Sequence, residues 1–327
     1  MRLKIGLLVV AALLIGCSDD SRPSSRLDGE FGPDAPIRVT ATVGMVADLV
    51  RNVGGDRVTV TQICGSGVDP HVYQTTRDDV LALRDADVVF YCGLMLEGQM
   101  TGMLEQQSKQ RPVIAVAESL DLSQLIEPDG GSGHPDPHVW MDVASWSGCL
   151  DVIVERLSDL DAAGAETFQT NAEAYRAELE QLHRYGSDRI ASIPKDRRVL
   201  VTSHDAFNYF GRAYDLEVIG VQGISTESEA GLKRINDLVD TLVDRNIQSV
   251  FVESSVSAAN IRALVEGAQS RGHTVAIAPR PLYSDAMGPA GTYRGTYIGM
   301  LDHNITEVTL GLGGDAPQAG MNDRLTP

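Results

Sequence analysis

The first half of the chain alternates between two patterns of apolar residues. Short runs typical of buried strands occur in "IRVTATV", "RVTVTQI", "DVVFY" and "RPVIAVA". Between them, apolar residues recur at helical spacing in "GMVADLVRNVGG" and "TRDDVLALRDA". Parallel strands need a crossover connection, usually a helix, so this alternation favours a parallel sheet covered by helices. We therefore predict an α/β lobe over residues 37–160.

The second half of the chain repeats this rhythm. Strands are predicted at "RVLVTS", "SVFVE" and "TVAIA", and helices at "EAGLKRINDLVDTLVDRN" and "AANIRALVEGAQSRG". The pattern indicates a second α/β lobe over residues 194–312, again with a central parallel sheet flanked by helices. The fold class predicted from the sequence is therefore α/β with two lobes.

A long helix is predicted between the lobes, over residues 161–193, with no proline before Pro194. Apolar residues recur there at spacings of four and three, at Phe168, Ala172, Tyr175, Leu179 and Leu182. A helix of about thirty residues extends about 45 Å at about 1.5 Å per residue, which is enough to pass along both lobes. Because one helix is stiffer than a pair of loops, we expect limited relative motion of the lobes.

The N-terminus has the features of a bacterial lipoprotein signal. Arg2 and Lys4 precede an apolar run from Ile5 to Ile15, which is too short for a membrane span but suits a secretory signal. The run ends in "LIGC", which resembles the lipobox in which cleavage leaves the cysteine to carry lipid. We predict a signal peptide over residues 1–16, lipid on Cys17 and an extracytoplasmic position on a bacterial membrane.

Two further segments are rich in small and polar residues. Residues 17–36 are rich in Ser, Asp, Pro and Gly and are predicted to form a flexible tether. Residues 313–327 are predicted to be a disordered tail.

The composition narrows the range of partners. With 327 residues, 43% of them hydrophobic, the chain can form one large or two medium lobes, and we expect two. The formal net charge of -18 argues against binding to nucleic acid, which requires clustered Lys and Arg. An acidic surface instead attracts cations.

Three cysteines remain after Cys17, an odd number that cannot pair completely within one chain. They lack the C-x-x-C spacing of a zinc knuckle or redox pair. Cys92 and Cys149 lie in apolar segments and are predicted to be buried. Cys64 precedes His71 by seven positions and could line its loop, but we do not expect it to bind metal.

The tetrapeptide Asp-Pro-His-Val occurs twice, at residues 69–72 and 136–139. Such a duplication can mark a repeat unit, a repeated turn or two halves of one site. Each copy follows a glycine-rich loop and precedes a helix start, so both fit ligand-binding loops at the carboxyl ends of strands. Proline fixes its own φ and restricts the residue before it, which preorganises the histidine. We interpret His71 and His138 as metal ligands facing one cleft, with a turn cap as the alternative.

The C-terminal half offers two partners for these histidines. His204 follows the strand "RVLVT", and Asp285 follows the strand "TVAIA". Three imidazoles and one carboxylate from four strand-end loops suit Zn²⁺ or Mn²⁺. The other histidines are interpreted as solvated, structural or loop contacts: His134, His183, His273 and His303.

Four segments resemble the signatures of the TroA-like metal-binding lipoproteins, the substrate receptors of manganese, zinc and iron ABC importers. They are "DPH" at residues 69–71, "DPHVW" at residues 136–140, "VTSHDAFNYF" and "LYSDAMG", and the match extends from about residue 37 to about residue 311. The resemblance implies two lobes joined by a backbone helix, with the metal held between them. The implied ligands are His71, His138, His204 and Asp285.

Three details refine the resemblance. The third ligand is His in some members and Glu in others, so His204 favours the TroA-type site over the manganese-dedicated type. The long His-rich loop of many zinc-dedicated members is reduced here to "GGSGHPDPH". Ser66 stands where many relatives have proline, which would loosen the first loop.

By resemblance, the protein is a receptor that captures one divalent ion (Zn²⁺, Mn²⁺ or Fe²⁺) as the transported ligand. Its partners would be the membrane permease and ATPase subunits of an ABC importer, and we expect a monomer that is not an enzyme. One alternative is a secreted zinc hydrolase with Glu227 or Glu229 reaching the cleft, although no H-E-x-x-H motif is present. The other is a surface adhesin, which would not require four convergent ligands.

Overall fold

The computed structural model describes residues 31–127 and 133–325. The predicted signal peptide over residues 1–16, the predicted lipidation at Cys17 and the tether up to residue 30 lie outside the described residues. The last part of the predicted tether forms an isolated bridge between Gly32 and Ala35. None of the described helices combines the length and apolarity needed to cross a membrane.

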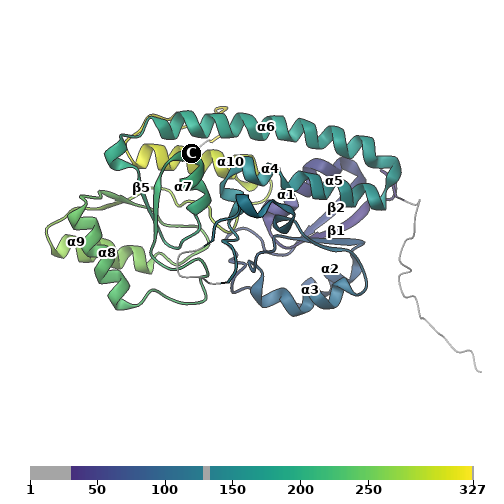
Figure 1. Ribbon diagram of the computed structural model, residues 1–327, viewed down its shortest axis with the longest axis horizontal. Helices are drawn as coiled ribbons and strands as arrows, with labels where there is room; N and C mark the ends of the chain where they lie inside the picture. Colours follow the sequence, from purple (N-terminus) through teal and green to yellow (C-terminus); the bar gives the residue numbers. More distant parts are fainter. Residues whose placement is uncertain (1–30, 128–132, 326–327) are drawn as a thin grey trace, which may run out of the picture.

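The N-terminal lobe is built on a parallel four-stranded sheet in the order β2-β1-β3-β4. Its strands are β1 (Ile37–Ala41), β2 (Val58–Gln62), β3 (Val88–Tyr91) and β4 (Val113–Ala115). Its helices are α1 (Gly44–Gly54), α2 (Arg77–Asp85), α3 (Thr101–Ser108), α4 (Val143–Ser147) and α5 (Cys149–Leu160). In Figure 1, α1 and α5 lie above this sheet, and α2 and α3 lie below it. The predicted alternation of strands and helices is therefore confirmed for this lobe.

The C-terminal lobe contains shorter strands. They are β5 (Val199–Thr202) paired with β6 (Glu217–Gly220), and β7 (Ser249–Val250) paired with β8 (Ala276–Ile277), both in parallel. The N–H of Phe251 donates to the carbonyl of Val201 at 2.9 Å, which places the two pairs side by side. The helices are α7 (Asn208–Tyr214), α8 (Leu232–Asp244), α9 (Ala259–Ser270) and α10 (Tyr297–Gly311). The segment "TVAIA" forms only the two-residue strand β8, and the chain beyond it pairs again only through an isolated bridge between Leu282 and Glu253 in the described residues.

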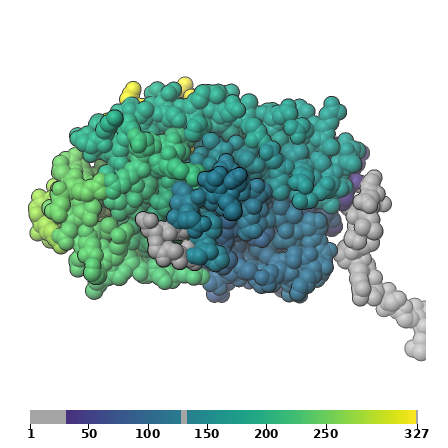
Figure 2. Space-filling view, in the orientation of Figure 1, coloured from purple at the N-terminus to yellow at the C-terminus, as the bar shows by residue number. Residues whose placement is uncertain are grey.

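The predicted connector is a single helix, α6 (Ala165–Ala191), which crosses the top of the molecule (Figure 1). Every apolar residue predicted to face the lobes is buried, from Phe168 to Leu182, and the same face continues to Gly186 and Ile190. The helix packs on α1 and α5 of one lobe and on α7 and α10 at the other. Figure 2 shows both lobes meeting beneath it. The helix starts later than predicted because residues 162–164 form a 3₁₀ turn capped by Asp161.

The tail differs from its prediction. Residues 313–327 are predicted to be disordered, but residues 313–325 fold back onto the molecule, and the last two residues of the tail lie outside the described residues. The N–H of Met321 donates to both carboxylate oxygens of Asp302, at 2.9 and 3.1 Å, and Leu325 is 2% exposed. Composition suggested disorder, whereas one buried carboxylate that needs donors and one apolar anchor hold this segment in place.

Candidate metal centre

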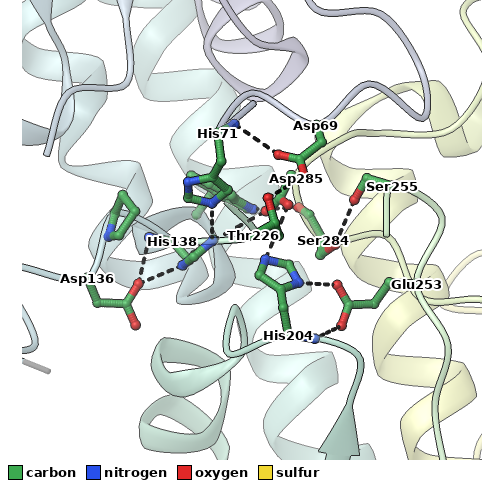
Figure 3. Close-up of polar contacts among 12 residues, drawn as sticks. Asp69, His71, Asp136, His138, His204, Thr226, Glu253, Ser255, Ser284 and Asp285 are labelled. Atoms are coloured by element: carbon green, nitrogen blue, oxygen red, sulfur yellow. Dashed lines mark hydrogen bonds and ion pairs between the residues drawn. The ribbon is translucent and has the colours of Figure 1, made fainter. Parts of the chain in front are cut away.

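The four side chains singled out in the sequence lie together between the lobes (Figure 3). His71 lies in the loop after β2, and His138 immediately precedes the 3₁₀ turn Val139–Met141. His204 is the second residue after β5, and Asp285 lies in the loop that follows β8. Two ligand candidates thus come from each lobe, all from loops that follow the carboxyl ends of parallel strands.

The four donor atoms lie close enough together to hold one metal ion. One atom from each of the four residues lies within 4.8 Å of all the others. Nε2 of His138 is 3.3 Å from Nε2 of His71 and 3.3 Å from Oδ1 of Asp285. Nε2 of His204 is 3.2 Å from Oδ2 of Asp285. Two donors bonded tetrahedrally to one Zn²⁺ at about 2.0–2.1 Å lie about 3.3–3.4 Å apart, so these three spacings fit such an ion.

Burial separates this cluster from an ordinary acidic surface. His138 and His204 are fully buried, and His71 and Asp285 are 4% and 1% exposed. Nε2 of His204 and both oxygens of Asp285 make no hydrogen bond of standard geometry among the described atoms, although they lie 3.2–3.3 Å from ligand atoms of the same cluster. Buried polar atoms without partners are rare in proteins and need an explanation. A bound cation would satisfy these three atoms at once.

Two buried carboxylates orient two of the imidazoles. Oδ1 of Asp136 is 2.7 Å from Nδ1 of His138, and Oε2 of Glu253 is 2.5 Å from Nδ1 of His204. Each carboxylate also accepts the backbone N–H of the histidine that it orients, at 2.9 Å in both cases. A proton on Nδ1 leaves Nε2 free to bind a metal, which is the usual arrangement around metal-binding histidines.

Protons on two imidazoles offset part of the negative charge in this centre when no ion is bound. Burial lowers the pKa of His138, but the carboxylates of Asp136 and Asp285 outweigh burial and raise the pKa to about 9. Burial is likewise overcome at His204, where Asp285 and Glu253 raise the pKa well above its ordinary value. The pKa of Asp285 is held well below its ordinary value by these two imidazoles despite burial. A divalent ion therefore replaces protons that occupy the same place.

His71 has a different environment. Burial lowers its pKa to about 3, so this imidazole is neutral. Within the described residues, none supplies a carboxylate to its second ring nitrogen. Its loop is instead fixed through the backbone, because Oδ1 of Asp69 accepts the N–H of His71 at 2.9 Å. His71 also lines a cleft of about 1050 Å³ between the lobes, and it is the only one of the four candidate ligands to do so in the described structure.

The two lobes are joined behind the site by buried hydrogen bonds. Nε1 of Trp140 donates to the carbonyl of Ser284 at 2.9 Å, and the hydroxyl of Tyr297 donates to the carbonyl of Trp140 at 2.7 Å. These bonds fix the loop of Asp285 against the loop of His138. The position of Asp285 is therefore determined by packing on both sides.

The other candidates from the sequence do not reach the donor cluster. Oε1 of Glu227 accepts from Gln99, and Oε2 of Glu229 accepts from Gln222 and Asn260. The three cysteines of the described chain are free and buried, as predicted for Cys92 and Cys149, and Cys64 lies outside the donor set.

The remaining histidines lie outside the cluster of four donors. His134 lines the cleft beside His71. The ring of His183 packs on that of Tyr214. His273 and His303 each contact a backbone carbonyl through Nε2, that of Ile247 at 2.7 Å and that of Pro281 at 2.9 Å. These contacts agree with their interpretation as structural or loop residues.

Sequence reasoning missed the residues that orient the ligands. Asp136 belongs to the repeated tetrapeptide, but its acceptor role toward the ring of His138 was not foreseen. Glu253 ends the strand segment "SVFVE", and a carboxylate at the carboxyl end of a strand was a usable signal. Thr226, whose hydroxyl donates to Oδ2 of Asp69 at 2.5 Å, gave no signal in the sequence.

The chain is similar to known metal-binding proteins over most of its length. The family described as zinc-uptake complex component A periplasmic matches residues 39–310. The chain is 44% identical over 310 residues to the manganese-binding lipoprotein MntA of Bacillus subtilis, covering 95% of this chain and 98% of that protein. It is 41% identical over 279 residues to the zinc-binding protein TroA of Treponema pallidum, covering 85% of this chain and 90% of that protein.

The solved structure of the periplasmic zinc-binding protein TroA from Treponema pallidum superimposes with a TM-score of 0.82. That comparison covers 85% of this chain and 99% of the other, at 41% identity. The family match spans most of the chain, and both curated relatives are matched over nearly their whole length. The chain therefore belongs to the family of zinc-uptake complex component A periplasmic proteins.

Proposed function

We propose that this protein is an extracytoplasmic receptor that captures one Zn²⁺, Mn²⁺ or Fe²⁺ ion and delivers it to an ABC import permease and its ATPase. The observation that carries this proposal is the convergence of four buried donors from both lobes, at His71, His138, His204 and Asp285. The relatives are named as manganese-binding and zinc-binding proteins, which supports a divalent cation as the ligand.

Capture fits this site better than catalysis does. A catalytic zinc site keeps one coordination position open for water, whereas four protein donors close the coordination sphere. Asp136 and Glu253 are each bonded to a ligand histidine, which leaves neither as a free general base. The family consists of solute-binding receptors, which favours this interpretation over a zinc hydrolase.

The donor set does not fix which ion the cell delivers. Three imidazoles and one carboxylate are a good set for Zn²⁺, and an N/O site generally binds Zn²⁺ more tightly than Mn²⁺ or Fe²⁺. Physiological selection therefore follows from metal supply as well as from affinity. The names of the relatives divide between manganese and zinc accordingly.

The N-terminal segments complete the proposal. Cleavage after residue 16 and lipid on Cys17 would anchor the protein, and residues 17–36 would link the anchor to the lobes. The receptor would act as a monomer, with lobes at 37–160 and 194–312 and the connector at 161–193. The names of several relatives as lipoproteins support this anchoring.

The test is metal content and stability of the protein without its signal peptide, carrying Cys17→Ser. One ion per chain should be retained, and saturation at about a thousand times the dissociation constant should add about 4 kcal/mol of stability. Asp285→Ala should abolish most of this gain, because it removes the only carboxylate among the proposed ligands. His134→Ala, which alters the cleft but no proposed ligand, is the matched control. Equal metal content in the wild type and Asp285→Ala would contradict the proposal.

A further inference from the structure

Both aspartates of the repeated tetrapeptide are bonded to the opposite lobe. Oδ2 of Asp136 accepts from Nδ2 of Asn208, the first residue of α7, at 3.1 Å. Oδ2 of Asp69 accepts from the hydroxyl of Thr226 at 2.5 Å (Figure 3). The other oxygen of each aspartate accepts the backbone N–H of its own histidine. Each copy therefore connects one candidate ligand to a side chain of the C-terminal lobe.

Thr226 belongs to residues 223–230, which form the central part of the connection between β6 and α8. The segment is fixed to its own lobe through Glu229, whose Oε2 accepts from Gln222 at 3.2 Å and from Asn260 at 2.9 Å. It reaches the N-terminal lobe through two consecutive residues. Thr226 donates to Asp69, and Glu227 accepts from Nε2 of Gln99 at 2.6 Å.

The contacts of Thr226 and Glu227 differ in whether their partner in the N-terminal lobe is bonded to a candidate ligand. The partner of Glu227 is an exposed glutamine that touches no candidate ligand. The partner of Thr226 is the carboxylate that holds the backbone of His71. Asp69 and Pro70 are conformationally restricted, so a displacement of the aspartate moves the histidine with it. Among the described residues, no carboxylate is bonded to the ring of His71, so no such contact holds the ring in place.

We propose that Thr226 is a positioning residue for His71. Its hydroxyl fixes the carboxylate of Asp69, which holds the backbone of His71, so full retention of the ion requires residues 223–230 to be seated on the N-terminal lobe. This inference rests on the proposed function and deepens it, because it names the contact through which the C-terminal lobe acts on His71. Since the contact joins the two lobes beside the site, its loss should mainly accelerate dissociation of the ion.

The experiment compares four single variants of the mature protein loaded with Zn²⁺. Thr226→Val removes the hydroxyl with little change of shape, and Thr226→Ser restores it. Ser225→Ala removes the neighbouring hydroxyl, which accepts only the local N–H of Glu227. Gln99→Ala removes the other cross-lobe bond of the same segment. Stopped-flow transfer of Zn²⁺ to a coloured chelator gives the dissociation rate, and competition gives the affinity.

Thr226→Val should release Zn²⁺ about tenfold faster, the lower end of the effect expected for an outer partner of a metal ligand. The three other variants should stay within about threefold of the wild type, below that range. A Gln99→Ala effect equal to that of Thr226→Val would overturn the proposal, because Thr226 would then act only as one of two tethers between the lobes.

A double variant tests whether the effect passes through His71. With His71→Ala, three candidate ligands remain, and weaker binding is measured at higher metal concentration. Adding Thr226→Val to His71→Ala should change affinity less than twofold, since coupled residues are non-additive. A further tenfold loss would show that Thr226 acts independently of His71 and would refute the inference. A wild-type protein that binds no divalent ion would instead refute the proposed function, so the two failures are distinguishable.

Discussion

The two Asp-Pro-His-Val segments have the same sequence and the same turn but different surroundings. In both, the aspartate accepts the N–H of the histidine two residues later, at 2.9 Å. In the second copy, the same carboxylate also contacts the imidazole of His138. In the first copy, the aspartate contacts only the backbone of its histidine and the hydroxyl of Thr226. One histidine is therefore held by its ring and the other by its main chain.

This difference gives the two histidines different charge states. His138 lies between Asp136 and Asp285 and has a pKa raised to about 9. His71 lacks a bonded carboxylate within the described structure, and burial lowers its pKa to about 3. A tetrapeptide thus determines the local turn, because Asp-Pro restricts the backbone. The role of the imidazole is determined by the side chains that the tertiary structure brings to it.

The largest expected difference between the loops is in the stability of the metal-free protein. His138→Ala leaves Asp136 and Asp285 buried without the cation between them, and breaking a buried ion pair costs about 3–5 kcal/mol. At about 2–4 °C per kcal/mol, the melting temperature should fall by roughly 10 °C. His71→Ala removes a neutral ring and should lower the melting temperature of the metal-free protein by about 2 °C or less. Calorimetry of both metal-free variants is the measurement, and equal losses would contradict the assigned charge states.

The pH dependence of affinity should separate the same two histidines. A raised pKa means that the protonated ring of His138 stabilises the metal-free fold below about pH 6.5, its unfolded value. That stabilisation is lost as the pH rises through about 9. An ion must displace this proton, so affinity for Zn²⁺ should rise at least tenfold per unit between about pH 7 and pH 9.

The number of protons released on metal binding shows which histidine causes the rise of Zn²⁺ affinity with pH. Calorimetric titrations in two buffers of different ionisation enthalpy should show at least one proton released per ion near neutral pH. His138→Ala should reduce the number by one, whereas His71→Ala should leave it unchanged because its ring is already neutral. Affinity that stays flat over this pH range, without proton release, would mean that both imidazoles are neutral before the ion arrives.

Replacing the two aspartates in turn should show a smaller difference. Asp136→Asn removes the acceptor that orients the ring of His138 and should weaken metal binding about a hundredfold, the upper end for such partners. Asp69→Asn acts on His71 only through the backbone and should cost about tenfold. Both changes remove one negative charge near the ion, so their ratio isolates the contact with the ring. Competition titration gives both affinities, and equal losses would remove the distinction between the loops.

The predictable part of this molecule is the part set by local sequence. Alternating apolar runs predicted the strands and helices of the N-terminal lobe, and the spacing from Phe168 to Leu182 predicted the buried face of α6. Strand-end loops predicted where His204 and Asp285 would lie. The contacts of Glu253 and Thr226 could not be predicted in this way. They depend on residues 49 and 157 positions away, and on how two lobes close against each other.

The smallest expected effect concerns the stiffness of the first loop. The carbonyl of Gly65 accepts the N–H of Val68 at 3.2 Å, and Gly67 has a φ of 73°, whereas the φ of Ser66 is not positive. These features define a type II turn with Ser66 at its second position, where proline is favoured. Ser66→Pro should therefore stabilise the metal-free protein by about 0.4–1 kcal/mol, because proline restricts the unfolded chain. The melting temperature should rise by roughly 1–3 °C. The same substitution should also slow release of Zn²⁺ slightly, since His71 depends on its backbone for orientation. A lower melting temperature for Ser66→Pro would contradict the assignment of Ser66 to the second position of a type II turn.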